Sequence, residues 1–143
     1  MNISLKTVKI TALGLAVVIA VLLGVLVFWS PAEGPTKVPE ISVTMPKAGD
    51  MITSPAGIEG QALGNWFFEA SFPIKILDGD GTVLGQGHAQ ALGDWMTTGT
   101  VAFSASIPFT AAHYATGTVL FTNDNPSGDP ANQKRFGVEV KFK

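Results

Sequence analysis

Residues 72–90 read FPIKILDGDGTVLGQGHAQ, and this stretch decides the fold class. Phe72, Ile74 and Ile76 recur every second residue, so they would share one face of an extended strand. A second alternating face follows the aspartates and glycines, and it consists of Val83, Gly85, Gly87 and Ala89. Glycine and aspartate between two alternating segments are typical of a hairpin turn. The stretch therefore predicts two antiparallel strands joined by a bend.

The same two-residue period continues through the rest of the chain after residue 40. It is clearest in RFGVEVKFK at 135–143, where Phe136, Val138, Val140 and Phe142 would face inward. We expect about seven short strands, because clusters of Gly, Pro, Asn and Asp separate the alternating segments. The predicted strands lie at 41–45, 54–62, 72–77, 83–90, 101–107, 117–123 and 135–143. This pattern predicts an all-β, immunoglobulin-like antiparallel β-sandwich.

The first part of the chain predicts a membrane anchor. Residues 10–29 form an uncharged apolar run of the length that crosses a bilayer about 30 Å thick as a helix. Lys6 and Lys9 precede the run, so residues 1–9 would stay in the cytoplasm and the rest would lie outside. We expect a single-pass protein of the bacterial cytoplasmic membrane with an uncleaved signal anchor. A cleaved signal peptide is the alternative, although Ser30-Pro31-Ala32 matches a cleavage site poorly.

Small residues recur every four positions within this run, at Ala12, Ala16, Ala20 and Gly24. Such a face lets two transmembrane helices approach closely, so a homodimer is one expectation; the other is ordinary helix composition. Residues 30–38 are rich in Pro and Gly and predict an extended linker. The exported domain would then occupy residues 39–143.

Charge and cysteine content restrict the partners of the exported part. From Glu33 onward the chain has 7 basic and 11 acidic residues, which gives a net charge of 7 − 11 = −4. A negative domain argues against nucleic acid and against anionic lipid surfaces. The sequence contains no cysteine, so burial and hydrogen bonds alone must stabilise the fold.

Four segments also resemble a known family: SPAGIEGQA (54–62), FFEASFPIKILDGDGTVLGQGHA (67–89), GDWMTTGTVAFSASIPF (93–109) and NDNPSGDPANQKRFGVEVKF (123–142). In this order they are similar to successive blocks of the immunoglobulin-like domain of bacterial spore germination. The resemblance implies a β-sandwich that is attached to, or exported across, a bacterial membrane. It implies no catalytic residues and no cofactor.

Two polar segments are candidate cation sites. Asp78 and Asp80 resemble the start of a calcium loop, but the twelve-residue template requires a glutamate where Ala89 stands, so we favour a simple turn. The segment NDNPSGDP at 123–130 supplies further oxygen atoms from Asn123, Asp124, Asn125 and Asp129. Asx-turns, a cation, or contact with a protein or glycan would each explain this second segment.

Catalysis has little support in the sequence. His88 and His113 lack the spacing of a zinc site, and no G-x-S-x-G motif or phosphate-binding glycine loop is present. We therefore expect a protein that is not an enzyme.

The segment WFFEAS at 66–71 contains the least expected charge, Glu69, among aromatic residues. A carboxylate in apolar surroundings requires a hydrogen bond or an ion pair, so a tie between strands explains Glu69. A recognition site is the other interpretation, with Trp66 and Trp95 as stacking faces for a sugar or peptide, although aromatic residues at strand ends more often belong to the core. Three hypotheses follow: an envelope interaction module with a protein partner, a carbohydrate or peptidoglycan binder, and a calcium-stabilised adhesion domain.

Overall fold

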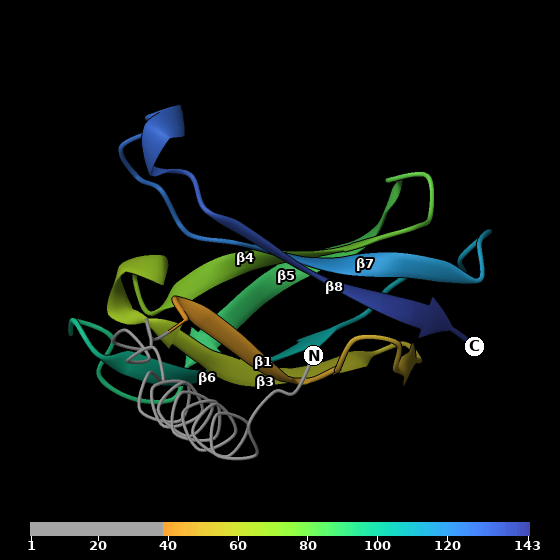
Figure 1. Cartoon of the computed structure of the whole chain (residues 1–143), viewed down its shortest axis with the longest axis horizontal. Helices are drawn as coiled ribbons and strands as arrows, with labels where there is room; N and C mark the ends of the chain where they lie inside the picture. The colour runs from red at the N-terminus through yellow and green to blue at the C-terminus, as the bar shows by residue number, and fades with distance from the viewer. Residues whose placement is uncertain (1–38) are drawn as a thin grey trace, which may run out of the picture. The chain divides into compact units, whose positions relative to one another are not determined.

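A computed structural model describes residues 39–143, which fall within one compact unit, Val38–Lys143 (Figure 1). The predicted cytoplasmic segment at 1–9, the transmembrane helix at 10–29, its small-residue face and the linker at 30–38 lie outside the described residues. Within residues 39–143, no helix is long and apolar enough to cross a membrane.

The described residues form eight strands and two short 3₁₀ turns. The strands are β1 (Ile41–Met45), β2 (Met51–Ile52), β3 (Ala56–Leu63), β4 (Ser71–Leu77), β5 (Val83–Ala91), β6 (Thr100–Ile107), β7 (Thr116–Thr122) and β8 (Arg135–Phe142). The 3₁₀ turns are η1 (Gly64–Trp66) and η2 (Pro130–Asn132). Each of the predicted strands is present, so the all-β prediction is confirmed. Strand β2 is additional, and its two residues are too few to show a period.

The strands lie in two layers (Figure 1). Their hydrogen-bonded order is β1-β3-β6-β5-β4-β7-β8-β2. Strand β5 pairs with β4 over most of its length but with β6 only at Gln90 and Ala91, so it connects the two layers. The β1-β3-β6 layer and the β5-β4-β7-β8 layer therefore form a sandwich with one flank closed by β5. This arrangement agrees with the immunoglobulin-like prediction.

Aromatic side chains from both layers fill the space between them. Phe72 on β4 is completely buried, and its ring packs edge-to-face against Phe67, Phe103 and Trp66 with centroids 5.0, 5.0 and 5.8 Å apart. Ile74 is also fully buried, as the alternation on this strand predicts. Since the chain has no cysteine, this aromatic cluster stabilises the core without a disulfide.

Strand β5 corrects one sequence prediction. Val83 was predicted to share a face with Ala89, yet it is 48% exposed while its neighbour Leu84 is buried. The cause is an irregularity in the β4–β5 ladder, where Ile76 pairs with Gly85 and Leu77 pairs with Val83. Leu84 is thus an extra residue in the ladder, and such a bulge reverses the alternation beyond it.

Candidate functional site

The DGDG segment forms the turn between β4 and β5. The Asp78 backbone N–H donates to the Thr82 carbonyl over 2.8 Å, and the Gly81 N–H donates to the Asp78 carbonyl over 2.9 Å. Asp80 Oδ1 accepts the Thr82 N–H, and Gly81 has a φ of +87° that favours glycine. The prediction of a turn is therefore confirmed.

Asp78 has a second structural role, because it connects this turn to the loop between β6 and β7. Its carboxylate accepts the backbone N–H groups of His113 (2.8 Å), Gly79 (2.9 Å) and Tyr114 (3.2 Å). Burial alone would raise the pKa of the Asp78 carboxyl, but these hydrogen bonds outweigh burial and lower the pKa below its ordinary value. His113 Nδ1 lies 3.4 Å from the same carboxylate, while the histidine ring is exposed. The oxygen atoms of Asp78 thus bind backbone amides.

No group of three or more His, Asp or Glu within residues 39–143 is arranged to hold a metal ion. A carboxylate oxygen of Asp80 also accepts a hydrogen bond within the turn, and the hydrogen bonds from Thr82 lower the pKa of the Asp80 carboxyl. The other histidine, His88, lies on the exposed side of β5. The two histidines therefore lie on separate elements, β5 and the β6–β7 loop.

The polar segment after β7 is organised around Asn123, which is buried. Its Oδ1 accepts the Lys134 N–H over 2.6 Å and the Gln133 side-chain amide over 2.8 Å, and its Nδ2 donates to the Asn132 carbonyl. Asp124 donates its backbone N–H to the Trp66 carbonyl. Asn123 is therefore a tie within the loop, and its oxygen is occupied.

Other candidates in this loop also hold its own backbone. The Asp129 carboxylate accepts the Ala131 N–H over 2.9 Å and caps η2, while the Asn125 amide donates to the Asp129 carbonyl over 2.8 Å. Ser127 donates to Asn125 Oδ1 over 2.6 Å. An open groove of about 550 Å³ lies beside this network, and its lining residues are Asn125, Gly128, Pro130, Gln133 and Arg135. The loop thus presents a polar, pre-ordered surface.

Trp66 does not have the predicted exposed face. It is only 2% exposed and packs against Phe72, so its ring is part of the core. Its indole Nε1 is buried without a hydrogen-bond partner among the described residues. The prediction was wrong because η1 folds Trp66 beneath the sandwich end, which local sequence does not reveal.

Glu69 also differs from the prediction. It is exposed at the tip of a two-residue turn in which Glu69 and Ala70 have φ values of +50° and +62°. Phe68 and Ser71 close the turn with reciprocal backbone hydrogen bonds of 3.0 and 3.1 Å. Positive φ at both central residues corresponds to a type I′ hairpin turn. Glu69 is therefore a solvent-facing turn residue and not a buried tie.

Trp95 lies in the loop between β5 and β6 and is half-buried against the core. This loop contacts η1 closely, since a Cβ added to Gly64 would lie 2.5 Å from the Trp95 carbonyl oxygen. The Gly64 N–H also donates to the Gly99 carbonyl over 3.1 Å. Trp95 thus keeps only part of its surface available for contact.

The predicted binding residues nevertheless gather at one end of the sandwich. We call this end, formed by residues 64–70, 92–99 and 123–134, the loop end; it lies on the left in Figure 1. Sequence reasoning missed its most exposed apolar side chains, which are Met96 (76%), Leu92 (65%) and Phe68 (41%). Each stands beside a turn or glycine, which is the local signal that could have indicated exposure.

An eight-stranded sandwich whose layers are joined by one bridging strand belongs to the immunoglobulin-like class of β domains. Residues 40–129 match the family model described as the immunoglobulin-like domain of bacterial spore germination, which is more than half of the 143-residue chain. The chain therefore belongs to this family and is a germination-associated module. No curated protein and no solved structure matches the chain.

Proposed function

We propose that the chain is a non-enzymatic interaction module that is anchored in the bacterial cytoplasmic membrane and displays its β-sandwich on the outer side. The match of residues 40–129 to a spore germination domain carries this proposal. The uncharged run at 10–29 supports the anchor, and Lys6 and Lys9 before it support an inside N-terminus. The helix fixes the location, and the linker at 30–38 sets the reach of the domain.

The loop end is the surface through which we propose contact with a protein partner of the envelope. Met96, Leu92 and Phe68 expose apolar area at this end of the sandwich, to which the 123–134 loop adds polar groups. Apolar side chains within a polar rim are typical of protein contact sites. Glu69 and the net charge of −4 of the exported part disfavour nucleic acid.

Site-specific photocross-linking tests this contact. A photoreactive residue at position 96 should capture a partner in intact cells, while the same residue at position 83 serves as the control. Val83 is also apolar and 48% exposed, but it follows the β4–β5 turn outside the loop end. Equal capture at both positions, or none at either, would contradict a contact through the loop end.

A glycan ligand is the second candidate, because the open groove beside the 123–134 loop has a polar lining that includes Arg135, whose guanidinium is suited to sugar hydroxyls. Trp95 could contribute a partial stacking face, whereas the buried Trp66 could not. Retention on purified peptidoglycan that decreases after Trp95→Ala would support this function. An absence of retention by the wild-type chain would remove it.

A further inference from the structure

The strand order leaves unpaired edges on one flank of the sandwich. Strand β5 closes the opposite flank, while β1 pairs only with β3. Strand β8 pairs with β7 along its length, but its other side pairs with β2 only at Lys141 and Phe142. The segment Arg135–Glu139 therefore has one edge without a strand partner among residues 39–143.

The hydrogen bonds show which backbone groups this edge presents. Phe142 donates its N–H to the Ala115 carbonyl on the β7 side, whereas Lys141 donates its N–H to Asp50 on the other side. Backbone groups of alternate residues point to opposite sides of a strand. The outward N–H and C=O groups consequently belong to Arg135 and Gly137, since the outward carbonyl of Glu139 already accepts the Gly49 N–H.

An open groove of about 500 Å³ lies beside this edge. Its apolar lining comes from Val43, Pro46, Ala48, Phe136 and Val138. The Lys134–Glu40 ion pair, 2.9 Å long, links β8 and β1 just before the open segment, and the Gly49–Glu139 hydrogen bond of 2.9 Å limits the segment at its other end. The open edge of β8 can therefore pair with a short strand, and the groove beside it can accept an apolar side chain from that strand.

We propose that the partner at this edge is β8 of a second copy of the chain, paired antiparallel with Phe136 opposite Phe136. In this register Arg135 of each copy lies opposite Gly137 of the other, so every free N–H of these residues meets a free C=O. The Phe136 rings, each 37% exposed in the single chain, cover one another and enter the groove. Pairing ends before Glu139, where Gly49 occupies the edge.

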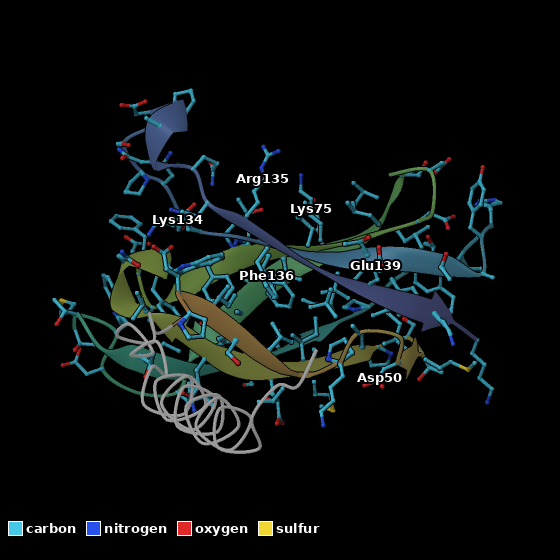
Figure 2. All side chains as sticks on the ribbon, in the orientation of Figure 1. Asp50, Lys75, Lys134, Arg135, Phe136 and Glu139 are labelled. Atoms are coloured by element: carbon cyan, nitrogen blue, oxygen red, sulfur yellow. The ribbon has the colours of Figure 1, made fainter. Side chains whose placement is uncertain are left out.

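Side-chain charge supports this self-pairing. Arg135 and Glu139 are both exposed on β8, and Figure 2 shows Arg135 pointing away from the sandwich and Glu139 further along the strand. In this register the diagonal neighbours of Arg135 across the ladder are Glu139 and Arg135 of the other copy, and because Gly137 has no side chain the guanidinium has room to turn from the like charge toward Glu139. The two-fold symmetry repeats this ion pair.

The two-fold axis of an antiparallel strand pair runs perpendicular to the sheet, so both copies of Glu40 remain on the same side of the joined sheets. Glu40, which precedes β1, pairs with Lys134 just before β8 and so lies close to the axis. The pairing itself does not depend on anchoring in a membrane. Strand β8 lies beyond residue 129, where the family match ends.

Disulfide trapping tests the register, and the chain suits it because it contains no cysteine. Directly opposed residues of a non-hydrogen-bonded pair have Cα atoms about 4.5 Å apart, within the range of a disulfide. The purified full-length Phe136→Cys chain should form a disulfide dimer on mild oxidation. Lys141→Cys is the matched control on the same strand, because β2 and Asp50 cover its edge. Cross-linking of Phe136→Cys at the control level would overturn the proposal.

Two further single-cysteine chains, Arg135→Cys and Gly137→Cys, keep the ring of Phe136 and so guard against loss of folding. A mixture of Arg135→Cys and Gly137→Cys chains should form a mixed disulfide more efficiently than either chain alone. In the Phe136→Cys background, Arg135→Glu should lower dimer formation to the Lys141→Cys level, and adding Glu139→Arg should restore it. A mixed disulfide no more frequent than the single-variant dimers, or failure of the charge swap to restore the dimer, would refute this register.

Discussion

Replacing Phe72 by alanine should strongly destabilise the domain. The side chain is fully buried and contacts three aromatic rings with centroids 5.0 to 5.8 Å away. Truncation of a buried Phe costs about 3–5 kcal/mol, and Phe72→Ala belongs at the upper end because its aromatic pairs are lost as well. Since domains of this size are stable by only about 5–15 kcal/mol, a loss at this upper end would remove at least about a third of the free energy of unfolding.

Urea unfolding of residues 39–143, followed by circular dichroism, measures this loss. Phe136→Ala is the matched control, because the same residue type is 37% exposed and contacts one ring, Phe121, at 6.2 Å. It should cost roughly 1 kcal/mol, in keeping with partial burial. The reasoning about the core fails if Phe72→Ala destabilises the domain no more than Phe136→Ala does.

Three other changes have definite expected outcomes. Because hydrogen bonds lower the pKa of Asp78 in the folded state, the ionised carboxylate should stabilise the domain fully above about pH 4, and this stabilisation should disappear as the pH falls through the folded-state pKa. Urea titrations at several pH values measure the pH dependence of the free energy of unfolding, and Asp78→Asn should flatten it. Asn123→Ala should lower the free energy of unfolding by about 1–3 kcal/mol, since it leaves two partly buried backbone groups, the Lys134 N–H and the Asn132 carbonyl, without this hydrogen-bond partner; no measurable change would contradict its role as a tie. Gly117→Ala should lower the thermal midpoint, because its Cβ would lie 2.1 Å from the Leu77 carbonyl oxygen, whereas Gly93→Ala, with nothing within 4 Å, should not; equal midpoints would contradict the close approach.

Local sequence was sufficient to predict most of the strands. Phe72 and Ile74 alternate with more exposed neighbours because one face of β4 packs against the opposite layer, so the period reports burial directly. The prediction for β5 was wrong at Val83 because the bulge at Leu84 depends on pairing with β4. A register shift involves two strands at once, and the pattern of one strand does not contain it.

The candidate site was less predictable for a related reason. The turn at Asp78 follows from local glycine and aspartate chemistry, but the hydrogen bond from His113 joins residues 35 positions apart. Trp66 is buried by contacts with Phe72. The exposure of Glu69 depends on a hairpin turn with two positive φ values, and the sequence WFFEAS does not indicate such a turn. Composition identifies residues suited to binding, whereas tertiary contacts decide which of them reach solvent.

Labelling of single cysteines in intact cells tests display outside the membrane most directly. The native chain has no cysteine, so a membrane-impermeant maleimide reports only the introduced residue. Lys143→Cys should react in intact spheroplasts, and Asn2→Cys should react only after lysis. Labelling of Asn2→Cys from outside, or protection of Lys143→Cys until lysis, would contradict the proposed display of the β-sandwich.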